Sequence, residues 1–123
     1  METNTQYLEY LYDLPSDEDT DWMTENYNYP ISGITCSILT RYSATGVSRS
    51  TWEAAYIMGL ELEYHLASYV PHLESIKVLE LGSGTGLGGI HFAKLMNHMG
   101  RNYTLYMSDV CEKSLKLISK NVK

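Results

Sequence analysis

A buried-strand pattern that runs directly into glycines constrains this fold more than any other feature of the chain. Residues 76–81 predict a strand, residues 82–89 contain five glycines, and residues 87–99 predict an amphipathic helix that ends at Gly100. Glycines between a strand and a helix let the backbone approach a ligand, and the helix N-terminus offers free N–H groups. We therefore interpret residues 78–89 as a nucleotide-binding turn.

The residues that follow extend this unit. Residues 103–107 predict a second strand, and residues 111–121 predict a further helix. A strand-helix-strand order requires the two strands to pair in parallel, with a crossover through the helix. The fold class is therefore α/β. We expect the last helix to bury the face formed by Leu115, Ile118 and Val122.

The segments before the glycine turn are less regular. We expect a helix over residues 7–14, an acidic loop over residues 15–30, a strand over residues 34–42 in a short β-ribbon turning at residues 44–46, and a helix over residues 51–69. Ser50 and Glu53 have the spacing of a capping box. The apolar stripe expected on this helix comprises Ala54, Ala55, Ile57, Met58, Leu62 and Leu66. We divide the chain into residues 1–33, an N-terminal helix and acidic linker, and residues 34–123, a β-ribbon, a helix and a βαβα unit.

Composition excludes several classes of function. The net charge of −6 argues against a nonspecific nucleic-acid surface, which draws on clustered Lys and Arg. Neither the two cysteines nor the four histidines have metal-ligand spacing, so we expect no metal site. We find neither a run of 18 apolar residues nor a signal-peptide pattern, and we expect a cytoplasmic protein without membrane contact.

Two acids indicate which ligand the turn holds. Gly84, Gly86 and Gly89 match the G-x-G-x-x-G pattern of dinucleotide sites, and Asp109 follows 20 residues later, where an acid that binds ribose belongs. However, Glu80 stands at the strand end, where it would repel a pyrophosphate but attract the positive sulfonium and amino groups of S-adenosylmethionine. This favours a methyltransferase over a dehydrogenase.

Structural explanations for the same residues remain open. The glycines could form a tight turn without a ligand, and Glu80 could bind only local N–H groups. Asp109 and Glu112 have the spacing of a capping box for the following helix.

Several segments resemble a known family. Residues 78–89 resemble motif I of class I S-adenosylmethionine-dependent methyltransferases, and Ser108-Asp109 with Leu115 and Asn121-Val122 resembles the segment after their second strand. Residues 44–47 and 51–55 resemble the lead-in of the seven-β-strand methyltransferases that modify lysines of translation factors and chaperones. Within that family the pattern is most similar to the eukaryotic enzymes that act on elongation factor 2. The resemblance covers residues 34–122, with a longer spacer at residues 48–50.

The resemblance implies a Rossmann-like fold, S-adenosyl-L-methionine as cofactor and a protein-lysine substrate, with elongation factor 2 as the candidate. It also implies the cofactor-binding residues: Trp52 lines the pocket, Gly82, Ser83 and Gly84 contact the amino-acid part beside Glu80, and Asp109 contacts the ribose. A tryptophan in a first helical turn is otherwise a core or staple residue.

The resemblance further implies a sheet of seven strands, of which two can be located before Lys123. The family's adenine-binding acid or aromatic residue follows its third strand, and an Asp-x-x-Tyr segment follows its fourth; neither can be located here. We therefore expect a fold truncated after the second strand and its helix, an N-terminal fragment that is inactive alone, and catalytic residues that lie beyond Lys123. A noncatalytic interaction module and an NAD-dependent oxidoreductase remain alternatives.

Overall fold

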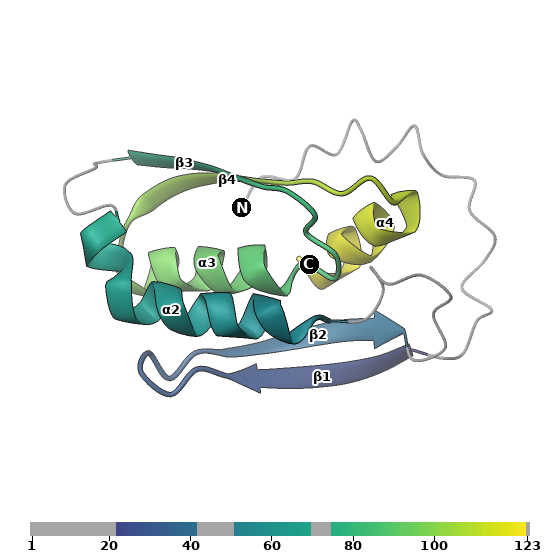
Figure 1. The fold of residues 1–123 in the computed structure, drawn as a ribbon, viewed down its shortest axis with the longest axis horizontal. Helices are drawn as coiled ribbons and strands as arrows, with labels where there is room; N and C mark the ends of the chain where they lie inside the picture. Colours follow the sequence, from purple (N-terminus) through teal and green to yellow (C-terminus); the bar gives the residue numbers. More distant parts are fainter. Residues whose placement is uncertain (1–21, 42–50, 70–74, 123) are drawn as a thin grey trace.

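The computed structural model describes residues 22–41, 51–69 and 75–122 (Figure 1). Strands β1 (Trp22–Asn28) and β2 (Thr35–Arg41) form an antiparallel hairpin, and β3 (Ser75–Glu80) and β4 (Asn102–Met107) form a parallel pair. Helices α2 (Glu53–Tyr69), α3 (Leu87–His98) and α4 (Glu112–Asn121) complete the order. The expected helix over residues 7–14, the turn at residues 44–46 and Ser50 lie outside the described residues.

The parallel pairing of β3 with β4 confirms the α/β prediction. Ser75 pairs with Asn102 at one end of the register and Glu80 with Met107 at the other, and α3 supplies the crossover. Both strands thus end at the same edge of the sheet. The predicted boundaries of β3, α3, β4 and α4 agree with the structure to within one residue at each end.

The hairpin corrects the expectation of a loop over residues 15–30. Trp22–Asn28 is a strand, and it pairs with Thr35–Arg41 in the register Asn26 to Ser37 and Asn28 to Thr35. The turn between the strands uses Gly33 at φ 76°, and the Tyr29 N–H donates to the Ile34 carbonyl at 2.9 Å. The predicted strand over residues 34–42 therefore pairs with a segment that precedes it. The hairpin crosses residue 33, and the division of the chain at that residue stays a prediction.

Helix α3 lies between the two strand pairs (Figure 1). On one side it packs against β3 and β4 in a core of Ile76, Phe92, Ala93, Leu95, Met96 and Leu105. On the other side Leu87 and Ile90 pack against Tyr29, Cys36 and Ile38 of the hairpin segment. Being covered on two sides accounts for a helix that is buried over most of its circumference.

Helix α2 lies beside α3 but does not bury the expected stripe. Ala54, Ile57 and Met58 are exposed, whereas Gly59 is buried and Ala55, Tyr56, Leu60 and Leu62 are partly buried. Leu66 has no described burial. The packed face is therefore rotated from the expected one, because close approach of α2 to Tyr29 and His91 occurs at Gly59.

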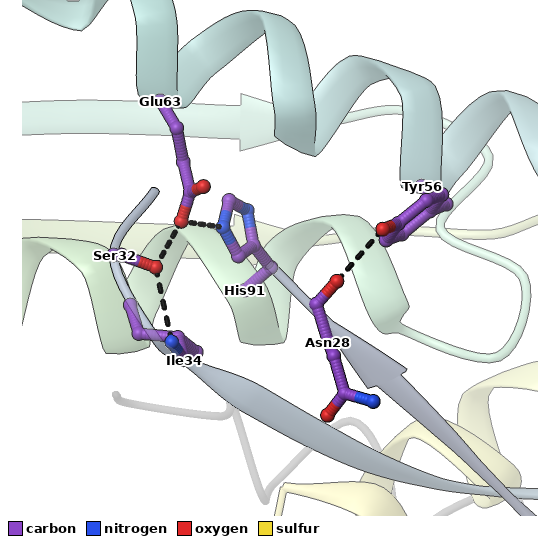
Figure 2. Close-up of polar contacts among 6 residues, drawn as sticks. All are labelled: Asn28, Ser32, Ile34, Tyr56, Glu63 and His91. Atoms are coloured by element: carbon purple, nitrogen blue, oxygen red, sulfur yellow. Dashed lines mark hydrogen bonds and ion pairs between the residues drawn. The ribbon is translucent and has the colours of Figure 1, made fainter. Parts of the chain in front are cut away.

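A polar cluster joins the hairpin to both helices (Figure 2). The Ser32 hydroxyl donates to Glu63 Oε1, and the same oxygen lies 3.2 Å from His91 Nε2. The His91 ring also stacks on Tyr29, with centroids 3.7 Å apart. In the same view the Tyr56 hydroxyl donates to the Asn28 carbonyl at 2.7 Å. These contacts fix the hairpin on α2 and α3.

Helix α4 packs with a slightly different face from the one expected. Ser114, Leu117 and Ile118 are buried, whereas Leu115 and Val122 are only partly buried. Ile118 approaches Gly86, because a Cβ there would lie 3.5 Å from Ile118 Cγ1. Helix α4 thus packs against the glycine turn itself.

Candidate functional site

The glycine turn lies at the carboxyl ends of β3 and β4. Gly82, Gly84 and Gly86 have φ values of 64°, 57° and 97°, in the left-handed region that side chains with a Cβ rarely adopt. The Ser83 N–H donates to the Ser108 carbonyl at 2.8 Å, and the Ser108 N–H donates to the Glu80 carbonyl at 3.0 Å. These bonds hold the turn against the end of β4.

The glycines that begin α3 have a packing role. A Cβ on Gly88 would lie 2.5 Å from Glu80 Oε2, and a Cβ on Gly89 would lie 2.8 Å from Met107 Cε. Only glycine lets the helix start this close to both strands. The same close approach is the physical role of the last glycine in nucleotide-binding turns.

Asp109 connects the turn to α4. Its Oδ2 accepts the Gly84 N–H at 2.9 Å, and its Oδ1 accepts the Cys111 N–H at 2.8 Å. The N-cap residue of α4 is Cys111, so a capping box that begins at Asp109 is not formed. A carboxylate has about four acceptor sites, so each oxygen keeps capacity for a further donor such as a ribose hydroxyl.

Glu80 lies beneath the start of α3. Burial raises the pKa of this carboxyl, and hydrogen bonds from Ser83 and from the Gly89 N–H partly lower it. Glu80 Oε1 is buried and has no hydrogen-bond partner among the described residues. Local N–H groups thus account for part of this acid, and the remaining oxygen is an acceptor that fits a cationic or N–H-bearing ligand.

Trp52 directly follows Thr51, a residue that contacts the glycine turn. Thr51 Oγ1 lies 2.8 Å from Thr85 Oγ1, so the start of α2 is tied to the glycine turn. The Trp52 side chain is 59% exposed, which argues against the alternative that it is a core residue. The predicted site residues Glu80, Gly82, Ser83, Gly84 and Asp109 therefore lie together at the strand ends, and Trp52 directly follows the residue that contacts Thr85 of the turn.

Sequence reasoning missed four residues that build this site: Thr51, Thr85, Ser108 and Asn121. Asn121 Nδ2 donates to the Thr85 carbonyl at 2.7 Å from the end of α4. Thr51, Ser108 and Asn121 belong to segments that resemble a known family, which is the available signal. Their contacts depend on chain folding over 25 and 36 residues and leave no local pattern.

Residues 22–41, 51–69 and 75–122 contain no group of three or more His, Cys, Asp or Glu side chains that could hold a metal ion. The described helices also lack the length and apolar character that crossing a membrane requires.

Comparison with known proteins identifies one family. The sequence model of a family described as lysine methyltransferase matches residues 35–123, which include the hairpin strand β2, the glycine turn and Asp109. A comparison with curated proteins finds no significant match. The family match includes each predicted cofactor-binding residue.

Proposed function

Because the chain belongs to the lysine methyltransferase family, we propose that its glycine turn binds S-adenosyl-L-methionine for transfer of a methyl group to a protein lysine. The observation that carries the cofactor assignment is the combination of Glu80 and the glycine turn at one strand end. Glu80 Oε1 is buried without a partner among the described residues, beside backbone that bends through three glycines with positive φ. An unpaired buried acceptor is costly unless a ligand completes it.

The roles of the residues follow from their positions. Gly82, Ser83 and Gly84 would contact the amino-acid end of the cofactor beside Glu80, Asp109 would accept the ribose hydroxyls, and Trp52 would cover the border of the pocket. Asp109 already orients the Gly84 N–H, so one side chain both shapes the turn and offers further acceptor sites. These contacts position the cofactor without supplying acid or base.

Methyl transfer requires little from the protein beyond positioning and desolvation of the two reactants. When bound, S-adenosylmethionine would supply an electrophilic methyl group for in-line attack by a neutral lysine amine. The C–N bond would form as the methyl–sulfur bond breaks, S-adenosylhomocysteine would leave, and the amine would lose a proton. The described residues would hold one reactant in place, and such positioning is worth about 7 kcal/mol or more of the barrier for well-aligned reactants. We assign no general base to them.

We propose elongation factor 2 as the protein substrate, with another translation factor or a chaperone as the wider class. Residues 44–47 and 51–55 support this choice, since they resemble the lead-in of such enzymes. The net charge of −6 also suits a basic, lysine-bearing partner.

Methylation assays test this proposal directly. The full chain is incubated with radiolabelled S-adenosylmethionine and purified elongation factor 2, and modified lysines are located by mass spectrometry. Label on a lysine of elongation factor 2 supports the substrate, and label only on another protein contradicts it. Cofactor binding without transfer to any tested protein would favour the expectation that residues 1–123 are inactive alone.

One observation favours a second candidate, a noncatalytic interaction module. Leu79 and Tyr106 pair across β3 and β4 and are 61% and 52% exposed, and Leu81 is exposed next to them. An apolar sheet face of this kind can serve as a contact surface. A stable protein complex that forms without cofactor and survives Asp109→Ala would favour the module, whereas a complex that requires cofactor would favour the enzyme.

A further inference from the structure

Asn121, the last residue of α4, connects three parts of the molecule. Its Oδ1 accepts the Leu39 N–H at 2.8 Å, and its Nδ2 donates to the Leu39 carbonyl at 3.0 Å and to the Thr85 carbonyl at 2.7 Å. The amide therefore pairs with β2 as a neighbouring strand residue would. With its remaining N–H it holds the glycine turn.

The contacts of Thr85 extend to the residue directly before α2. Thr85 is buried, and its hydroxyl lies 2.8 Å from the Thr51 hydroxyl, directly before Trp52. Thr51 also hydrogen-bonds the Tyr27 side chain in β1. Next to Thr85, Gly86 packs against Ile118 one turn before Asn121. The turn is thus held at the Thr85 carbonyl, at the Thr85 hydroxyl and at Gly86.

We propose that Asn121 is a positioning residue that sets the glycine turn and the Trp52 segment in their cofactor-binding arrangement. The expected effect on cofactor binding rests on the proposed function, whereas the effect on the glycine turn rests on the contacts of Asn121 alone. The hydrogen bonds of Asn121 go to Leu39 and Thr85, neither of which is predicted to bind the cofactor. Asn121 acts through Thr85, by fixing one carbonyl of the turn to the hairpin, while Asp109 fixes the Gly84 N–H.

If Asn121 only stabilised the C-terminal end of α4, then the same substitution at the end of another helix would have a similar effect. We therefore compare two Asn→Asp variants. Asn121→Asp keeps the size of the side chain but replaces two N–H donors with an oxygen that faces the Leu39 and Thr85 carbonyls. Asn97→Asp makes the same change in the last turn of α3, on an exposed residue. Both variants add a negative charge near a helix C-terminus, so the helix-dipole penalty is matched.

A third variant controls for lost stability alone. Ile76 is buried at the amino end of β3, opposite the end that carries the turn. Ile76→Val lowers stability by removing one buried methylene but leaves every contact of Asn121 intact.

Two measurements on the full chain test whether Asn121 positions the glycine turn. Amide hydrogen exchange of Gly84 and Gly86 reports the turn without any cofactor, and calorimetry with S-adenosylhomocysteine reports binding. In Asn121→Asp we expect exchange at both glycines to accelerate by about tenfold or more relative to the exchange of Met96 in α3, and affinity to fall by about tenfold. In Asn97→Asp and Ile76→Val, affinity should stay within about twofold of the unmodified chain.

Unchanged glycine exchange in Asn121→Asp overturns the inference, whether or not the analogue binds. Equal affinity losses in Asn121→Asp and Ile76→Val overturn it as well, because general destabilisation would then explain both. An unmodified chain that binds no analogue contradicts the proposed function instead, and the exchange comparison still decides whether Asn121 positions the turn.

Discussion

At the scale of single residues, Glu80 shows how stability and binding oppose each other. Its carboxyl is buried beneath α3, and burial raises its pKa. A carboxylic acid with a raised folded pKa binds more protons in the folded state, so its contribution to stability is lost as pH rises through that pKa. Near neutral pH, Glu80 therefore costs the free protein stability that a cationic ligand would recover.

We predict that Glu80→Gln stabilises the free protein near neutral pH and weakens binding of cationic cofactor analogues. The amide keeps an acceptor for the Gly89 N–H but carries no charge to desolvate. Urea unfolding near neutral pH and again near the ordinary glutamate pKa of 4.5 measures this, since the advantage of the variant should shrink in acid.

Calorimetry with sinefungin, which carries an amine in place of the methyl group, provides the binding readout. Glu53→Gln, an exposed acid in the first turn of α2, is the control for loss of a negative charge. Tighter nucleotide binding by Glu80→Gln would contradict the sign of the interaction and support a phosphate-bearing ligand.

Sequence reasoning at this scale succeeded where chemistry is local. Glu80 and Asp109 could be located because an acid at the end of a parallel strand faces the edge where ligands bind. Local sequence did not reveal Thr85 and Asn121, since the hydrogen bond between them spans 36 residues of the chain. The roles of the predicted residues in binding stay predictions.

At the scale of elements, Gly59 determines how close α2 lies to the hairpin and α3. A Cβ at this position would lie 2.6 Å from Tyr29 Cε1 and 2.9 Å from His91 Nδ1. These atoms belong to two stacked rings that are buried and cannot move aside cheaply. The packed face of α2 is set by this glycine and not by the expected apolar stripe.

We predict that Gly59→Ala destabilises the protein despite the better helix propensity of alanine. Propensity favours alanine by about 1 kcal/mol, whereas overpacking a filled interior costs about 1–3 kcal/mol. The net loss should therefore lie between about zero and 2 kcal/mol in denaturant unfolding. A clear gain in stability would mean that α2 can move away from the stacked rings at no cost.

We also predict that the polar cluster of Ser32, Glu63 and His91, which fixes the hairpin on α2 and α3, stabilises the protein less in mild acid. Burial lowers the pKa of His91, and the Glu63 carboxylate only partly offsets this. A histidine with a lowered folded pKa contributes stability that is present above its unfolded value of 6.5 and is lost as pH falls below it.

His91→Gln tests this dependence, because its amide can still donate to Glu63 but does not titrate. Stability measured from neutral pH to mildly acidic pH should fall less steeply in the variant than in the unmodified chain. His65→Gln, on an exposed part of α2, is the control for replacing a histidine outside the cluster. Parallel slopes for the unmodified chain and His91→Gln would contradict the prediction.

At the scale of the whole molecule, α3 between two pairs of strands organises the fold. The βαβα unit could be predicted because apolar periodicity and glycines mark its elements directly. Strand β1 could not, since Trp22–Asn28 is largely polar and gains its structure from β2, through side-chain bonds such as Ser37 to Asn26 at 2.7 Å. Tertiary pairing of this kind overrides local composition.

We propose that this architecture presents a site for a phosphate-free cofactor with a positive amino group. Calorimetry on the full chain with S-adenosylhomocysteine and with NADH, each repeated with Asp109→Asn, measures this selectivity. Because asparagine cannot accept both the Gly84 and the Cys111 N–H, the variant leaves one donor unpaired, at a cost of about 1–3 kcal/mol. We predict that the homocysteine analogue binds at least about tenfold more tightly than NADH, and that Asp109→Asn weakens binding of the analogue by about tenfold. Tighter binding of NADH would contradict a phosphate-free cofactor, and equal binding of the analogue by the unmodified chain and Asp109→Asn would contradict a role of Asp109 in the site.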